Sequence, residues 1–126
     1  MASELRVNTL KDAAGNNSIA TSFVAGGSAK SFITGTYSGG TPSNNKSLNV
    51  ASIVDTATGR VTVNFSSAFD SVNYAPLSNT HQSGNIDASQ NLIRNSASQL
   101  EMRFAEGGTT ETDPSSFYGA MHGDLA

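Results

Sequence analysis

Residues 59–66 read Gly59-Arg60-Val61-Thr62-Val63-Asn64-Phe65-Ser66, the clearest alternation of apolar and polar side chains in the chain. A period of two residues is that of a half-buried β-strand, so Val61, Val63 and Phe65 are predicted to face one side together. Residues 99–104 alternate in the same way, with an apolar side chain at every second position. The two stretches predict strands with one face in a core, and they place Phe65 and Phe104 there.

The chain beyond residue 28 has the same β character throughout. Further strands are predicted at 29–37, 48–53, 71–76 and 115–122. Loops are predicted at 38–46 and 106–114, because these segments consist largely of turn-forming residues. Short strands at intervals of about 8–12 residues, joined by such turns, are typical of a β-sandwich or barrel. We therefore predict an all-β fold, a small antiparallel β-sandwich or jelly-roll-like domain over residues 26–126.

Helical patterning is almost missing from the sequence. No segment shows a sustained apolar period of 3.6 residues, and only residues 88–93 are expected to hold one helical turn. The surrounding stretch, 77–98, is polar and weakly patterned.

In the last predicted strand, one of Phe117 and Tyr118 is expected to lie in the core.

Residues 1–25 are predicted to form an extended N-terminal arm or a hairpin. A strand-like alternation at its start is followed by a turn at 13–17, a short apolar stretch at 19–24, and a hinge at 25–28 that contains two glycines. So short a segment cannot bury its apolar side chains by itself, so it is predicted to lie on another subunit or another protein. The predicted docking and oligomer contacts are Leu5, Val7, Leu10, Ile19 and Phe23.

The composition excludes several classes of protein. The net charge is −3 and only 13% of the residues are charged, which argues against a nucleic-acid partner. No apolar run approaches the length of a membrane span, and the first six residues show no apolar region of a secretory signal. The absence of cysteine excludes disulfides and thiolate metal sites. A thin core without disulfides favours oligomerisation.

No group of residues predicts catalysis or a cofactor. His81 and His122 each lack a nearby acidic or histidine partner in the sequence. Residues 85–89 have the oxygen spacing of a calcium loop, but Gln90 and Ser96 stand where that loop needs glycine and glutamate. The four carboxylates between residues 101 and 113 are interpreted as solvated charges. We therefore predict that the protein is not an enzyme, and we expect no metal and no cofactor.

Two tyrosines are candidates for contact with a glycan. Tyr37 flanks a loop, and Tyr118 lies in the last predicted strand. An exposed ring at either position would suit stacking on a sugar, whereas an ordinary edge-strand tyrosine is the simpler interpretation of Tyr37.

Several motifs together carry a resemblance to a known family. The N-terminal stretch Leu5-Arg-Val-Asn-Thr-Leu-Lys-Asp-Ala-Ala-Gly-Asn-Asn-Ser18 resembles the start of many fibre and appendage proteins of tailed phages, common in marine and cyanobacterial phages. The next similar element is Gly27-Ser-Ala-Lys-Ser-Phe32. The strand-turn-strand segment Leu48-Asn-Val-Ala-Ser-Ile-Val-Asp55, with Gly59-Arg-Val-Thr-Val-Asn-Phe65, Phe69 and Asn73-Tyr74, is also similar. The similarity extends over nearly the whole chain.

The resemblance implies a protein of the virion, assembled in the host cytoplasm. It implies a small fibre or knob, a homotrimer whose arm docks onto the particle through a tail adaptor, a nozzle or a capsid protein. Contact with a host-surface glycan would be a further role. The chain lacks the fibrous shaft of longer family members, which weakens the expectation of receptor binding.

Two alternatives remain open from the sequence. A capsid-decorating protein that stabilises the head would use the same arm and the same β-domain. A carbohydrate-binding module would instead need an exposed aromatic cluster near Tyr37 or Tyr118.

Overall fold

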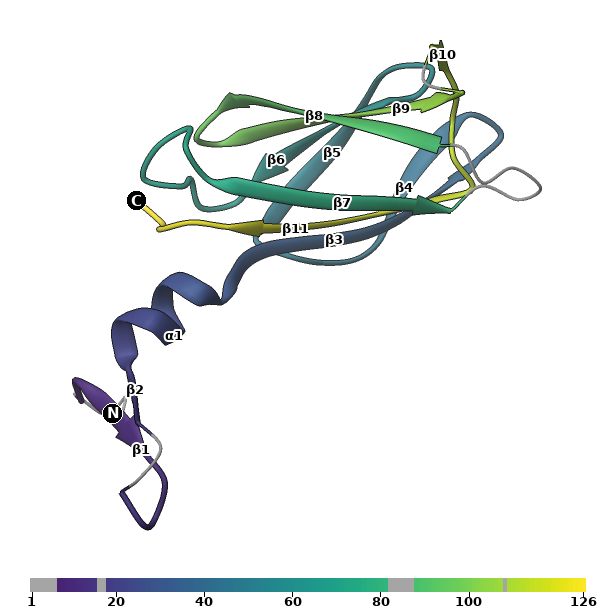
Figure 1. The fold of residues 1–126 in the computed structure, drawn as a ribbon. Helices are drawn as coiled ribbons and strands as arrows, with labels where there is room; N and C mark the ends of the chain where they lie inside the picture. The colour runs from purple at the N-terminus through teal and green to yellow at the C-terminus, as the bar shows by residue number, and fades with distance from the viewer. Residues whose placement is uncertain (1–6, 16–17, 82–87, 108) are drawn as a thin grey trace.

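The chain folds into an antiparallel β-sandwich with an N-terminal arm that projects from it (Figure 1). The computed structural model describes residues 7–15, 18–81, 88–107 and 109–126. The prediction of an all-β domain with an extended arm is confirmed.

Two sheets form the sandwich. Sheet I has the strand order β4 (Thr41–Leu48), β3 (Ala29–Ser38), β11 (Ser116–His122), β7 (Ala75–His81). Sheet II contains β5 (Val50–Ala57), β6 (Arg60–Phe65), β9 (Gln99–Glu106) and β8 (Ala88–Ser96), and the short β10 (Thr110–Glu111) pairs with the end of β9. All strand pairs are antiparallel.

The arm consists of a hairpin and a helix. Strands β1 (Thr9–Lys11) and β2 (Ser18–Ala20) pair with each other, and the helix α1 (Thr21–Gly27) leads to β3. The helix replaces the predicted apolar extended stretch and most of the predicted hinge, and it moves the start of the sandwich from residue 26 to Ala29. Its sequence contains two glycines, which are poor helix formers, so propensity gave no helical signal there.

The core lies between the sheets and is largely aromatic. The buried apolar side chains are Ile33, Val61, Val63, Phe65, Phe69, Tyr74, Leu100, Met102, Phe104, Phe117 and Met121. The predicted core positions Phe65 and Phe104 are confirmed, and Phe117 rather than Tyr118 is the buried residue of the last strand. Phe69 and Tyr74 stack with their ring centroids 4.5 Å apart, although they lie outside the regular strands.

Three predictions about elements were wrong. The expected loop at 38–46 contains most of β4, and the expected helical turn at 88–93 lies in β8. The strand expected at 71–76 begins only at Ala75. These strands are stabilised by backbone pairing at the sheet edges, where side chains need no apolar alternation because much of their surface faces water.

Polar contacts connect the edges of the two sheets. On one side the chain passes from β4 to β5 through Asn49, whose φ of 55° turns the backbone. The Asn49 side chain donates a hydrogen bond to the Ser67 carbonyl and accepts one from the Ser67 amide. On the other side, the Ser78 hydroxyl donates to the Gln90 side chain, which in turn donates to Thr80 at 3.3 Å. The sandwich is therefore joined along both of its long edges.

Candidate functional site: an apolar row and an unburied arm

An apolar row crosses the outer face of sheet I. Strand register places Leu48 opposite Phe32, Phe32 opposite Ala120, and Ala120 opposite Leu77, so one residue from each of the four strands joins the row. Leu77 is 62% exposed and Leu48 is 50% exposed. Ile33, the residue after Phe32 in β3, is buried in the core. Phe32 and its partners across the sheet therefore lie on the outer face. We call these four residues the apolar row.

Tyr118 extends the apolar row into a shallow groove. It is 43% exposed and lies opposite Thr34 and Asn79 in the adjacent line of the sheet. The groove has a volume of about 360 Å³, and its lining includes side chains of Phe32, Leu77 and Tyr118. The Tyr118 hydroxyl lies 2.9 Å from the Ser116 hydroxyl, which orients the phenol along the strand. The face is thus apolar at its centre and hydroxylated at one margin.

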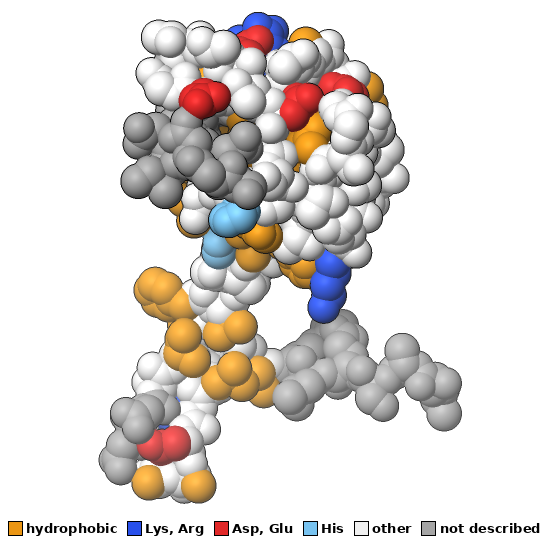
Figure 2. All heavy atoms as spheres, turned by 90° about the vertical axis from the view of Figure 1, so that its right-hand side faces the viewer, with side chains coloured by type: hydrophobic (Ala, Val, Ile, Leu, Met, Phe, Trp, Pro, Cys, Tyr) orange, Lys and Arg blue, Asp and Glu red, His pale blue; other side chains and the backbone are white. Residues whose placement is uncertain are grey.

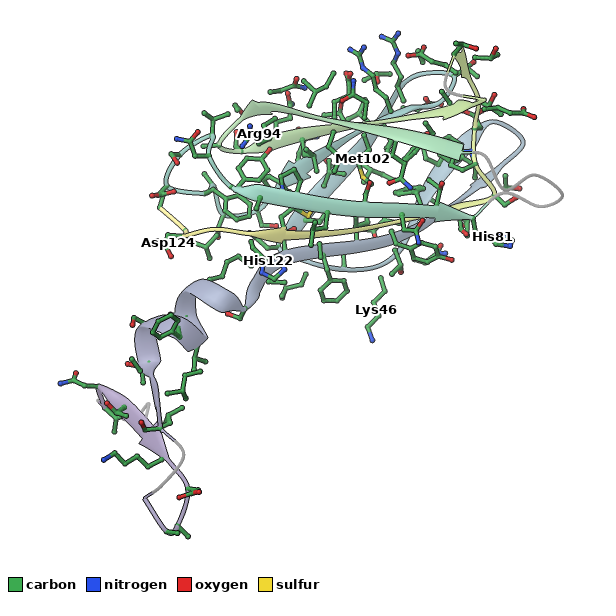
Figure 3. All side chains as sticks on the ribbon, in the orientation of Figure 1. Lys46, His81, Arg94, Met102, His122 and Asp124 are labelled. Carbon is green, nitrogen blue, oxygen red and sulfur yellow. The ribbon has the colours of Figure 1, made fainter. Side chains whose placement is uncertain are left out.

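Charge is sparse on this face. Lys46 lies opposite Thr34, and Figure 3 shows its side chain extending away from the sheet. His81, the last residue of β7, pairs with Ser116, the first residue of β11, and His122 pairs with Ala75 at the other end of these two strands. Figure 3 shows the two histidines at opposite ends of the sheet. The structure therefore does not bring the two histidines together.

The arm leaves its apolar side chains uncovered. Phe23 is 73% exposed, and α1 has no buried residue. Val7, Leu10 and Ile19 are also exposed, with Leu10 opposite Ile19 in the hairpin. Figure 2 shows hydrophobic side chains gathered on the surface of the arm. Four of the five predicted docking residues are therefore available for contact, and the fifth, Leu5, lies outside the described residues.

Hydrogen bonds fix the junction between arm and sandwich. The Ser28 amide donates to the Val24 carbonyl at 3.2 Å, and the Ser28 hydroxyl donates to the Ala25 carbonyl. The Lys30 ammonium donates to the same Ala25 carbonyl and to the Ser28 hydroxyl. These bonds satisfy the end of α1 and hold its direction relative to β3.

The ring of Tyr37 is partly buried against the core, an arrangement that disfavours the predicted glycan contact there. The ring packs edge-on against Phe104 and Phe117, with centroid distances of 6.4 and 5.7 Å. Its hydroxyl oxygen is buried and has no hydrogen-bond partner among the described residues. Burial, together with the negative charges of Asp113 and Asp55, raises the pKa of Tyr37. The predicted glycan contact at Tyr118 stays a prediction.

Replacement of the Tyr37 hydroxyl should stabilise the fold. We expect Tyr37→Phe to raise the free energy of unfolding by about 1 kcal/mol, because it removes an unpaired buried polar group. The unfolded phenol ionises near pH 10 while the folded one stays protonated, so the wild type should lose stability above about pH 10 more steeply than the variant. Urea unfolding at neutral pH and at pH 10–11 measures both effects.

Tyr74 supplies the matched control. Its hydroxyl donates to the Gln99 carbonyl at 2.9 Å, and burial raises the pKa of Tyr74 to about 12. Tyr74→Phe should therefore lower the free energy of unfolding at neutral pH by about 1 kcal/mol. Equal destabilisation by both variants would show that the Tyr37 hydroxyl has a partner after all.

The acidic residues near the end of sheet II make structural contacts. Glu101 pairs with Arg103, and Glu111 accepts from the Arg60 Nε at 2.7 Å, which raises the pKa of Arg60. The Asp113 carboxylate accepts from the Gly59 amide at 2.6 Å. Residues 85–87 of the calcium-like segment lie outside the described residues, and residues 88 and 89 begin β8.

The described part of the chain contains no group of three or more histidine or acidic side chains placed to hold a metal ion, and no helix long and apolar enough to span a bilayer.

Sequence patterning missed the apolar row, although one signal was present. Phe32 and Ile33 are adjacent in a strand, so the period of two must send one of them outward. Leu48 joins through the hairpin of β3 and β4, whereas Ala120 and Leu77 join through β11, whose partners β3 and β7 are far away in the sequence. Comparisons of the chain with protein-family models, with curated proteins and with solved structures find no match.

Proposed function

We propose that this chain is a structural component of a tailed-phage virion, a short fibre-like or knob-like appendage that docks through its N-terminal arm. The proposal combines the resemblance of its motifs with the geometry of the arm. In it, the sandwich projects from the particle and the protein carries out no catalysis.

The observation that carries the proposal is the unburied arm. The helix α1 buries no residue, and the exposed Leu10 and Ile19 of the hairpin do not reach the core of the sandwich. A two-stranded hairpin with a seven-residue helix is too small to be stable by itself in water. Contact with another protein would cover these apolar side chains and supply the missing stability.

The independent core and the neutral surface of the sandwich also support the proposal. Its core contains no arm residue, so it is a folded body independent of docking. Serine, threonine, asparagine and glycine account for 55 of the 126 residues, which makes for a surface of neutral hydrogen-bonding groups. Many copies on one particle would multiply weak single-site contacts with a host surface by avidity.

Deletion of residues 1–27 should abolish incorporation into virions. The shortened protein should still unfold cooperatively, because the whole core is retained. The test is a phage that carries an epitope-tagged copy, with particles purified by density gradient and probed for the tag. Gold-labelled antibody against the tag on intact particles locates the protein on tail or head.

A full-length Val54→Ser protein is the matched control. Val54 is an exposed apolar residue, 46% accessible, on sheet II and outside the arm, so its replacement should leave incorporation unchanged. Normal incorporation of the arm-deleted protein would overturn the proposal.

A further inference from the structure

We infer that the helix α1 of one copy packs on the apolar row of sheet I of a second copy, so that neighbouring subunits are joined by exchanged arms. The inference rests on the proposed function only in taking the protein to act as a multi-copy assembly. It assigns α1 to contact between copies and leaves the hairpin β1–β2 for contact with the particle.

The helix α1 and the apolar row of sheet I both expose apolar side chains that their own chain leaves uncovered. Phe23 and Val24 are exposed on α1, and Leu77, Leu48 and Phe32 form an apolar strip on the sheet. Exposed apolar area of this kind marks a contact site when it is contiguous, as it is across the four strands. Burial of a phenylalanine against such a strip removes apolar surface from water on both sides.

The junction directs α1 away from the sheet of its own chain. A single residue, Ser28, separates the end of α1 from the start of β3. The hydrogen bonds of Ser28 and Lys30 to the last turn of the helix hold the two elements in the outward arrangement seen in Figure 1. To reach its own apolar row, the helix would have to reverse direction at Ser28 and break these bonds. The helix of a neighbouring copy meets no such barrier.

The distribution of charged side chains favours sheet I over sheet II as the surface on which the helix packs. The segment from Ser18 to Gly27 contains no charged residue, and neither does the apolar row. Sheet II carries the ion pairs Arg60–Glu111 and Arg103–Glu101, and Arg60 lies opposite Arg103 in the sheet. An uncharged helix placed there would have to strip water from these charged groups, which costs free energy, whereas the nearest lysines of sheet I, Lys30 and Lys46, lie outside the row, each two residues from one of its members.

The area of contact favours reciprocal exchange. Stable interfaces bury about 1,200–2,000 Å² in total, more than one short helix can cover. The arm leaves the sandwich at β3, the strand that also carries Phe32, so donor and acceptor surfaces start from the same strand. In a closed ring each copy gives one helix and receives one, so every copy takes part in two such contacts and no row is left uncovered.

Disulfide trapping tests the contact directly, because the chain contains no cysteine. Full-length Phe23→Cys and Leu77→Cys proteins with different tags are mixed under mild oxidation and separated on non-reducing gels. We expect a mixed dimer, at least tenfold more abundant than that from Phe23→Cys mixed with Val54→Cys. Val54 is a fitting control because it is exposed and apolar but lies on sheet II. Equal yields from the two mixtures, or a product dominated by Phe23→Cys joined to itself, would overturn the inference.

Sedimentation velocity supplies the second measurement. The wild type and Val54→Ser should sediment as an oligomer of the 13.0 kDa chain, and Phe23→Ser and Leu77→Ser as monomers. Both replaced side chains are exposed, so neither variant should unfold. A monomeric wild type would overturn the inference and leave the proposed function standing if incorporation still needs the arm. Trapped exchange with arm-independent incorporation would overturn the proposed function instead.

Discussion

Phe117→Ala should lower the free energy of unfolding by about 4 kcal/mol. Phe117 is completely buried at the centre of the sandwich, on a strand that pairs with β3 on one side and with β7 on the other. Its ring contacts those of Tyr37 and Phe104, each at a centroid distance of 5.7 Å. Truncation therefore removes apolar burial and two aromatic contacts, and it leaves a cavity that the paired strands cannot close.

Urea unfolding followed by circular dichroism measures the loss. The midpoint should fall with little change in the slope, because the amount of surface exposed on unfolding stays similar. A domain of this size has a free energy of unfolding of about 5–15 kcal/mol, so the loss is a large fraction of the total and should be readily measured. Tyr118→Ala is the matched control: Tyr118 is the next residue, also aromatic but exposed, and its loss should cost less than about 1 kcal/mol. Similar losses for the two variants would contradict the assignment of Phe117 to the core.

Gly35→Ala should cost about 3 kcal/mol through overpacking. A Cβ at residue 35 would lie 2.2 Å from Cζ of Phe117 and 2.7 Å from the backbone oxygen of Ser43. The ring is held by its neighbours and the oxygen belongs to the paired strand β4, so neither can move aside cheaply. The thermal midpoint of the variant, compared with that of the wild type, measures the effect.

Two further variants make the Gly35 prediction specific. Gly26→Ala is the control, because nothing lies within 4 Å of a Cβ at that exposed position, and the sandwich should unfold as in the wild type. Combination of Gly35→Ala with Phe117→Leu should recover part of the loss, since the smaller side chain makes room for the new methyl group. Strictly additive losses in the double variant would contradict a clash between these two residues.

The folded sandwich is also the platform for assembly in the proposed function. Phe117 and Gly119 of β11 face the core, whereas Tyr118 and Ala120 of the same strand face outward. Destabilising substitutions at the inner positions should therefore disturb the outer face as well. Substitutions at Leu77 or Phe23 should disturb assembly alone, which separates the two kinds of effect in any screen of variants.

Local patterning was enough to predict the strands that have one face in the core. Val61, Val63 and Phe65 alternate with polar residues, and this period of two residues predicts that their side chains share the buried face of one strand. The arm was also predictable, because apolar residues in a short segment bounded by glycines cannot form a core of their own. The prediction of an outside contact therefore followed from length and composition.

Features that depend on strand register, or that lie in unpatterned segments, could not be predicted from local patterning. Strands β4 and β8 are largely polar and form because neighbouring strands offer backbone partners, which no local pattern reports. The inward turn of Tyr37 depends on the rings of Phe104 and Phe117, far away in the sequence. The apolar row unites Leu48, Phe32, Ala120 and Leu77 only through the pairing of four strands. Alternation along one strand specifies the face of each side chain, but long-range register alone specifies its neighbours across the sheet.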